Sequence, residues 1–580
     1  MQPLAIQDIA RRYQSVDAEK THGATYTPEA LARFVAEQIV ENADLEGRTS
    51  ISILDPAIGD GALVLALLEV LKSKTRAALS VRGFDTNVSA LDEAARRIRA
   101  VCAKTTVELT RGNFLDFVLE ADGNKAAPSL FSSNEVLRYD LVIANPPYVR
   151  TQIMGSERAQ QLANTFGLTG RVDLYQAFLL GMAQVLAPNG TAGMIVSNRF
   201  MTTKGGGALR AALRHQFDLQ KIWDLGDTKL FNAAVLPAVL VARGTESPSN
   251  DAPVFTSIYE VKDEAAARAA DPVDALAHEG IVEIEDGRRF RVRHGVLDSS
   301  GDDGDVWRLA SESGDEWMAT VDRHTWKRFG DIGKIRVGVK TCADKVFIRN
   351  DWEIAFGSEK PELLRPLTTH HGAGRFRATL PKKARYILYP HEVVRGSRQA
   401  ISLEDFPKSR TYLESHRATL ESRSYVIEAG RRWYELWVPQ DPQAWSAPKL
   451  VFRDISERPT FWIDLSGSVV NGDCYWLIVS RNDNTDLLWL AAAVANSTFA
   501  EAFYDHRFNN KLYAGRRRFI TQYVELFPIP DPALPLSKDI IERAKAIYEA
   551  DHAPETADME SELDTLVWRA FGSGIKEVSR

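Results

Sequence analysis

The feature that most constrains this 580-residue chain is an alternation of short apolar runs with helix-like segments over its first 245 residues. The runs are rich in Val, Ile and Leu, and most are separated by a segment with helical periodicity. Because parallel strands need a long crossover, usually a helix, this pattern predicts a doubly wound α/β sheet with helices on both faces. The strands are expected at 51–55, 79–84, 106–109, 140–145, 192–197, 220–225 and 235–242.

Polar motifs follow the carboxyl ends of these strands. The first strand ends in Asp55 and continues through Gly59 into a helix over 63–71. A strand, a glycine loop and a helix bring a ligand against bare backbone at a helix N-terminus. A dinucleotide fingerprint would place a third glycine at Val64, so a nicotinamide cofactor is not expected. The loop suits a ligand without a pyrophosphate, whose charged amino-acid end approaches Asp55 and Gly59.

The next two strands also end in candidate ligand residues. Asp85 ends the second strand, at the interval where α/β nucleotide sites place a carboxylate for ribose hydroxyls. After the third strand, the Asn113 amide could bond an adenine edge while the Phe114 ring lies against its face. A surface Asn and a core Phe explain this pair equally well.

The fourth strand runs into Asn145-Pro146-Pro147-Tyr148. Proline fixes φ and donates no hydrogen bond, so a rigid exposed loop is expected. Such a loop can hold the Asn145 side-chain oxygen and the Pro146 carbonyl as two acceptors, with the Tyr148 ring beside them. Binding both N–H groups of a conjugated amine frees its lone pair for attack, which is the chemistry of methylating an exocyclic base amine. Taken alone, the four residues could also be only a turn.

Thr27-Pro28-Glu29 precedes these motifs and is expected to begin a capped helix. The motifs, taken in this order, resemble those of the γ-class, Taq-type adenine-N6 DNA methyltransferases of restriction–modification systems. The resemblance implies S-adenosylmethionine (SAM) as cofactor, bound by Thr27, Asp55, Ala57, Gly59, Asp85, Asn113, Phe114 and Asn145. It implies a catalytic set of Asn145, Pro146, Tyr148 and Phe231, with Phe231 on the far face of an extruded adenine. The family usually has Asp where this chain has Asn113.

The net charge of −7 is unevenly divided along the chain. Residues 1–245 carry about +1, 246–330 about −9, 331–530 about +6 and 531–580 about −5. These segments are expected to be a SAM-binding catalytic domain, an acidic linker or insertion, an α+β DNA target-recognition domain and a solvated helical tail, respectively.

The basic segment contains clusters of Lys and Arg near aromatic residues. Phosphate contact is their expected use, and base readout a minority use. The candidate nucleic-acid residues are Lys382, Lys383, Arg431, Arg432, Arg516, Arg517 and Arg518.

The expected function is direct methyl transfer to N6 of a flipped-out adenine in duplex DNA, within a restriction–modification or related defence system. An RNA or a protein-glutamine methyltransferase using the same loop is the alternative, and a basic module of about 200 residues favours nucleic acid. The intact acceptor loop argues against a non-enzymatic DNA-binding subunit. The resemblance makes a separately encoded restriction endonuclease an expected partner. The protein is expected to be monomeric and cytoplasmic, and no apolar run approaches membrane-spanning length. The three cysteines lack metal-ligand spacing, so no metal is expected.

Overall fold

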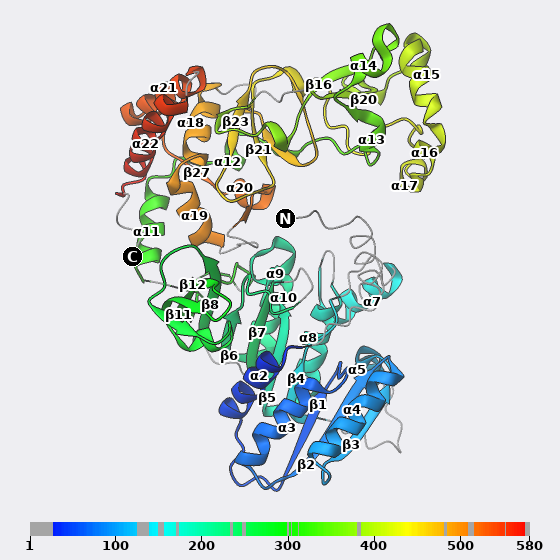
Figure 1. Ribbon diagram of the computed structural model, residues 1–580, viewed down its shortest axis with the longest axis vertical. Coiled ribbons are helices and arrows are strands. Elements are labelled where there is room, and N and C mark those ends of the chain that lie inside the picture. Colours follow the sequence, from blue (N-terminus) through cyan, green and yellow to red (C-terminus); the bar gives the residue numbers. More distant parts are fainter. Residues whose placement is uncertain are drawn as a thin grey trace. The chain divides into compact units, whose positions relative to one another are not determined.

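The computed structural model describes residues 27–123, 138–148, 156–169, 173–231, 236–245, 251–298, 301–302, 304–310, 312–379, 384–480, 484–508, 516–550 and 553–574. The chain forms two compact units, one ending at residue 311 and the other starting at residue 312 (Figure 1). Among the described helices, none is both long and apolar enough to cross a membrane.

The first unit is built on one large sheet. Its strands are β1 (Ser50–Asp55), β2 (Ala78–Asp85), β3 (Thr106–Arg111), β4 (Tyr139–Ala144), β5 (Leu186–Ser197), β6 (Phe217–Asp224), β7 (Pro237–Gly244), β8 (Val254–Val261), β9 (Ala267–Ala269), β10 (Gly280–Ile284), β11 (Arg289–Leu297) and β12 (Leu309–Ala310). The order is β3-β2-β1-β4-β5-β7-β6-β8-β11-β10-β9, with β12 beside β11. Strands β1 to β6 run parallel, and β7 is reversed between β5 and β6. All seven predicted strands are therefore confirmed.

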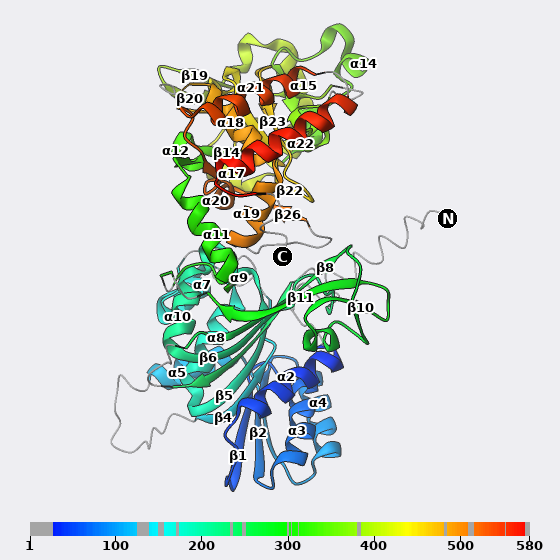
Figure 2. The same cartoon turned by 90° about the vertical axis from the view of Figure 1, so that its left-hand side faces the viewer.

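Helices cover both faces of this sheet, as the doubly wound prediction requires (Figure 2). They are α2 (Glu29–Asn42), α3 (Ala62–Lys74) and α4 (Val88–Val101) on one face, α5 (Phe114–Gly123), α8 (Leu174–Val185) and α10 (Gly207–Gln216) on the other, with α7 (Ser156–Phe166) and α9 (Arg199–Thr202) in addition. Neighbouring strand residues point to opposite faces. Thus Ile53 joins the apolar cluster under α2 and α3, and Leu54 joins the one under α5 and α8.

The segment expected as an acidic linker or insertion forms part of the first unit's sheet. Strands β8 to β12, within residues 254–310, extend the catalytic sheet beyond β6 through a parallel β6–β8 pairing. Phe255 and Phe290 are fully buried in this extension. The contact boundary between the units therefore lies at residue 311, and not at 245 or 330.

The second unit contains several small sheets, consistent with the expected α+β class. A five-stranded sheet has the order β14 (Ile335–Val337), β25 (Cys474–Leu477), β21 (Lys449–Arg453), β23 (Phe461–Asp464) and β17 (Phe376–Arg377). A four-stranded sheet has the order β15 (Ile348–Arg349), β18 (Tyr386–Leu388), β16 (Leu364–Thr368) and β24 (Val469–Val470). Three strand pairs are β13 (Lys327–Arg328) with β27 (Pro528–Ile529), β19 (His391–Val394) with β20 (Ser397–Ala400), and β22 (Ile455–Ser456) with β26 (Arg517–Arg518).

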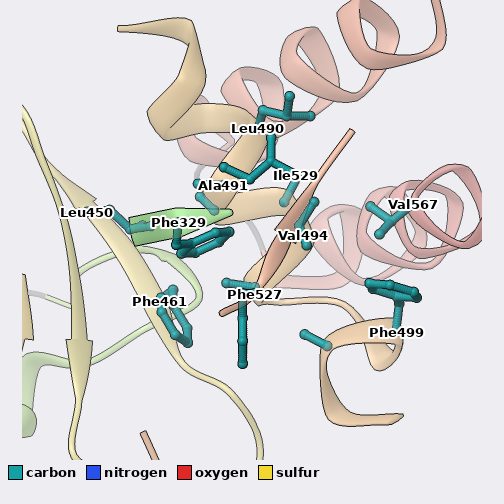
Figure 3. Close-up of a cluster of buried hydrophobic side chains, with 14 of the residues drawn as sticks. Phe329, Leu450, Phe461, Leu490, Ala491, Val494, Phe499, Phe527, Ile529 and Val567 are labelled. Atoms are coloured by element: carbon teal, nitrogen blue, oxygen red, sulfur yellow. The ribbon is translucent and has the colours of Figure 1, made fainter. Parts of the chain in front are cut away.

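The helices of the second unit form a core around an apolar helix, α18. The helices are α11 (Glu312–Arg323), α12 (Phe329–Ile332), α13 (Asp344–Phe347), α14 (Trp352–Phe356), α15 (Pro407–Ser415), α16 (Arg417–Glu421), α17 (Ser424–Glu428), α18 (Asp486–Ala495), α19 (Thr498–Phe508), α20 (Thr521–Val524), α21 (Pro535–Glu549) and α22 (Ala553–Ala570). Figure 3 shows Leu490 and Val494 of α18 among Phe461, Phe527 and Val567.

The C-terminal segment is helical, as expected, but it is not a solvated tail. Ile540 and Ala544 of α21 and Val567 of α22 are fully buried in the same core as α18. Removing these helices would expose the apolar side chains that they cover, so α21 and α22 belong to the folded unit.

Candidate active site

The carboxylate of Asp55 ends β1 inside the protein, with 1% of its surface exposed. Its Oδ1 accepts a hydrogen bond from the Ala57 N–H (3.0 Å), whereas Oδ2 has no partner among the described residues. Burial raises the pKa of Asp55 to about 8, and the nearby carboxylates of Asp85 and Asp60 add to the rise. A buried acceptor without a donor is costly, so this site suits a ligand that brings a positive charge to Oδ2.

The glycine loop lies against the end of β2. The Gly59 N–H donates to Oδ2 of Asp85 (3.0 Å), and Oδ1 of Asp85 accepts from the Asn87 N–H (2.7 Å). Gly59 has φ +52°, and a Cβ added there would meet nothing within 4 Å. The bare backbone therefore faces open space beside Asp85, whose carboxylate retains lone pairs for further donors. The structure thus brings Asp55, Gly59 and Asp85 together.

Asn113 and Phe114 follow β3 at the same edge of the sheet. The Asn113 side chain caps α5 by accepting from the Leu115 N–H (3.0 Å). The Phe114 ring is fully buried and packs on Phe84 and Phe178, with ring centroids 5.8 Å and 5.7 Å away. The prediction that this ring lies against an adenine face is therefore wrong, because the ring belongs to the core between sheet and helices.

Asn145 leaves β4 with its amide held from two sides. Its Nδ2 donates to Oγ1 of Thr27 (3.0 Å), and the Tyr148 hydroxyl donates to its Oδ1 (3.2 Å). Thr27 was expected to cap the following helix, but Pro28 occupies the N-cap position of α2 without a side-chain cap. Thr27 instead fixes the Asn145 side chain. Pro146, the next residue in the chain, is buried. One lone pair of Oδ1 remains for a substrate N–H.

The Tyr148 ring is half-buried and has an aromatic neighbour. Its centroid lies 6.2 Å from that of Tyr175 on α8, at an interplanar angle of 53°. Burial raises the pKa of both phenols, so both hydroxyls stay protonated at neutral pH. Tyr148 therefore acts as a neutral donor to Asn145 and as an apolar surface.

Phe231 lies in the loop between β6 and β7. Its ring is 6% exposed and packs in the apolar cluster that contains Trp223 and Ile258. Stacking of Phe231 on a base stays a prediction, and it requires the ring to turn out of this cluster.

Sequence reasoning missed a buried polar network at the ends of β5 and β6. Asp224, 3% exposed, accepts hydrogen bonds from the Tyr259 hydroxyl (2.6 Å) and from Asn198 Nδ2 (2.8 Å). Burial raises the pKa of Asp224 against the effect of these donors. The sequence did contain a signal for this network, because Asp224 is a carboxylate at the last position of an apolar strand. The same feature singled out Asp55 and Asp85.

Two of the predicted nucleic-acid arginines have partners inside the second unit. Arg517 forms a two-point ion pair with Asp505 (2.6 and 2.7 Å), and 11% of its side chain is exposed. Arg518 pairs with Asp454 at 3.1 Å. The prediction of phosphate contact is therefore wrong for Arg517, because its guanidinium is buried against a carboxylate.

The other predicted basic residues differ in availability. Arg431 donates to the carbonyls of residues 436 and 437 and lies over the Trp437 ring, which makes it a structural residue. Arg432 and Arg516 are exposed, although Arg432 also donates to the Tyr434 hydroxyl (2.7 Å). Lys382 and Lys383 lie outside the described residues.

Two protein families match the two units. The Eco57I restriction-modification methylase family matches residues 70–231, and the TaqI-like C-terminal specificity domain matches residues 397–529. The Type II methyltransferase M.BanIII of Aneurinibacillus aneurinilyticus is 35% identical over 577 residues, covering 96% of this chain and 97% of that protein. The chain belongs to the Type II DNA methyltransferases of restriction–modification systems.

More distant relatives agree with this assignment. The Type II methyltransferase M.BstVI of Geobacillus stearothermophilus is 23% identical, covering 88% of this chain and 91% of that protein. These full-length matches do not favour the RNA or protein-glutamine alternative. The cofactor of this methyltransferase is S-adenosylmethionine. The unpartnered Asp55 oxygen and the open backbone at Gly59 fit its positively charged amino-acid end.

Solved structures share the fold. A nuclease-deletion mutant of the Type ISP restriction-modification enzyme LlaGI, in complex with a DNA substrate mimic, has a TM-score of 0.52 at 10% identity, covering 91% of this chain and 47% of that chain. The DrdV–DNA complex has a TM-score of 0.50 at 14% identity, covering 93% of this chain and 58% of that chain. At these identities the likeness concerns the fold alone.

Proposed function

We propose that this methyltransferase modifies N6 of adenine at a fixed sequence in duplex DNA, and that it does so on a base flipped out of the helix. The observation that carries the proposal is the Asn145 amide, held by Thr27 at 3.0 Å and by Tyr148 at 3.2 Å. A fixed amide oxygen next to a proline carbonyl offers two acceptors in a rigid frame. An exocyclic amine with two N–H donors is the substrate group that this pair matches.

The acceptors act by changing the amine. Hydrogen bonds from both N–H groups to Asn145 Oδ1 and the Pro146 carbonyl draw the amine nitrogen out of conjugation with the ring. Because the Asn145 amide is held by Thr27 and Tyr148 before the substrate arrives, it needs no reorganisation during reaction. The amine proton can leave after attack, so no strong base is required. Tyr148 supports one face of the base, and Phe231 supports the other after it leaves its cluster.

Three groups at the carboxyl edge would hold the cofactor. Asp55 would bind the ammonium group through its unpartnered Oδ2, Gly59 would give the cofactor a close approach to backbone, and Asp85 would accept from ribose hydroxyls. When bound, SAM supplies a methyl group on a positively charged sulfur.

The second unit would recognise the DNA target. The specificity-domain match ends at residue 529, next to the predicted end of the recognition module at 530. Exposed Arg432 and Arg516 are the described candidates for phosphate contact. Double-stranded DNA is the proposed partner, in a cytoplasmic, monomeric protein that works beside a separately encoded endonuclease.

The test uses purified full-length protein, labelled SAM and three substrates: unmethylated duplex DNA, RNA and total protein. The expected result is label in duplex DNA alone, recovered as N6-methyladenine after digestion to nucleosides. Label on cytosine would refute the adenine assignment. Label in RNA or on glutamine with DNA unlabelled would refute the DNA assignment.

A further inference from the structure

Residues 225–231 form the first part of the loop between β6 and β7, and Phe231 is the last of them. The N–H of Leu225 donates to the carbonyl of Pro237, the first residue of β7 (3.0 Å), which closes the loop at its base. Since β4 and β6 run parallel, this loop leaves the sheet at the same edge as Asn145. The loop therefore lies on the catalytic side of the sheet.

Asp224 ties three segments of the chain together where this loop begins. Its Oδ2 accepts from the Tyr259 hydroxyl of β8 (2.6 Å). Its Oδ1 accepts from Asn198 Nδ2 after β5 (2.8 Å) and from the Gly226 N–H in the loop (3.2 Å). With 3% of its surface exposed, the carboxylate has its orientation set by these donors and not by solvent.

The first half of the loop also lies directly on β8. Gly226 has φ +47°, and a Cβ added there would come within 2.2 Å of the Ile258 carbonyl oxygen. One residue later, Asp227 is 1% exposed and accepts from the Glu260 N–H (2.8 Å). Asp224, Gly226 and Asp227 are thus fixed against the sheet extension.

Burying a carboxylate is expensive, and an apolar side chain of similar size would often cost the fold nothing. A fully satisfied polar network instead selects one local geometry. We propose that Asp224 and Tyr259 are positioning residues that hold the 225–231 loop so that Phe231 can reach the target base. This inference rests on the stacking role proposed above for Phe231. It also gives the sheet extension a use in the reaction, since β8 supplies Tyr259.

The direct test is Tyr259→Phe, which removes one hydroxyl and keeps the ring. We expect the single-turnover rate of methyl transfer to duplex DNA to fall about tenfold or more, because Asp224 loses its shortest donor. SAM affinity should stay unchanged, since the cofactor groups lie at β1 and β2. Tyr139→Phe is the matched control, because it removes a buried hydroxyl at the amino end of β4, and its rate should equal wild type.

A double-mutant cycle separates positioning from general destabilisation. If Tyr259 acts through Phe231, then Tyr259→Phe combined with Phe231→Ala should be no slower than Phe231→Ala alone. Gly226→Ala, which forces the loop off β8, should give the same pattern without a substitution at either Asp224 or Tyr259. Independent, multiplicative losses in rate would overturn the inference.

The outcomes also separate this inference from the proposed function. A slow Phe231→Ala variant together with wild-type rates for Tyr259→Phe and Gly226→Ala would refute only the positioning role. Wild-type rates for Phe231→Ala would refute the stacking role and the inference with it, while the nucleoside analysis would still decide the adenine assignment.

Discussion

Replacing Asp55 by Asn should weaken cofactor binding and stabilise the cofactor-free protein. In the wild type, Oδ2 of Asp55 is buried without a partner, and burial raises the pKa of Asp55 to about 8. The folded protein therefore holds this proton more tightly than the unfolded chain does. The carboxyl group's contribution to the free energy of unfolding falls as pH rises from about 4 to about 8, because the unfolded chain loses the proton first. Because Asn cannot ionise, the free energy of unfolding of the variant should not fall over this pH range for this reason.

The same pKa sets the pH dependence of cofactor binding. An ammonium group stabilises the ionised form of Asp55, so binding must release its proton at any pH below about 8. Affinity for SAM should then rise about tenfold per pH unit between pH 6 and pH 7.5. Above about pH 8 the cofactor's own α-amino group loses its proton, so affinity should stop rising.

Titration calorimetry tests this in buffers of different ionisation enthalpy. We expect release of about one proton per SAM bound at pH 6.5 in the wild type, and none in Asp55→Asn. Thermal unfolding without cofactor should show that the variant is more stable than wild type at pH 8, with a smaller difference at pH 5. A wild-type affinity that does not change with pH, or a pH dependence that survives in Asp55→Asn, would refute the ammonium contact.

Four further predictions concern the acceptor loop and the arginines. At saturating SAM, Asn145→Ala should lower the single-turnover methylation rate at least about 100-fold; near-normal turnover would refute the acceptor role. Thr27→Val removes the 3.0 Å hydrogen bond to Asn145 and should slow methyl transfer about tenfold in the same assay. Thr27→Ser keeps the hydroxyl and should transfer at the wild-type rate. Arg517→Ala should lower the free energy of unfolding by about 3 kcal/mol, measured by denaturant titration, because the buried ion pair with Asp505 is lost. By contrast, Arg516→Ala should leave stability unchanged and reduce the salt slope of DNA binding by about 1; an unchanged slope would remove Arg516 from the interface.

The sheet was predictable because its signals are local. Each strand is a short apolar run, and the predicted strand at 79–84 corresponds to Ala78–Asp85 in the structure. The one large boundary error is at β5, which was expected from 192 and begins at Leu186. The observed strand runs through Pro188 and Gly190, and Asn189 between them has φ +62°. Leu186 lies opposite Tyr139 of β4 and Thr191 opposite Leu141, so the register shifts across these residues and they form a bulge-like irregularity within the strand.

The sheet extension was misread because its composition is acidic. In β11, Phe290 and Val292 are buried while Arg289 and Arg291 point outward, a period of two that the charge count concealed. Arg289 pairs with Glu283 at 2.8 Å on the neighbouring strand β10. Charged residues on one face of an antiparallel strand are compatible with a buried opposite face. Alternation was therefore a better guide here than net charge.

The arginine cluster failed as a predictor for a different reason. Counting charges gives the number of cations in a segment but not the carboxylates that lie beside them in the fold. Asp505 is 12 residues from Arg517 in sequence, and Asp454 is 64 residues from Arg518. Only the folded structure shows that these two side chains are paired and that Arg516 is exposed.

One sequence signal, a carboxylate at the last position of a parallel strand, leads to three different roles at this edge of the sheet. Asp55 has an unpartnered oxygen, Asp85 bonds the glycine loop with lone pairs to spare, and Asp224 is satisfied by three donors. A buried acceptor without a donor is stable only when a ligand supplies one, whereas a fully bonded carboxylate has little left to offer a ligand. The number of donors already in place therefore separates ligand-binding from positioning carboxylates. By this reasoning, Asp55→Asn should stabilise the cofactor-free protein and weaken SAM binding. Asp224→Asn should instead loosen the loop that carries Phe231 and leave SAM affinity unchanged.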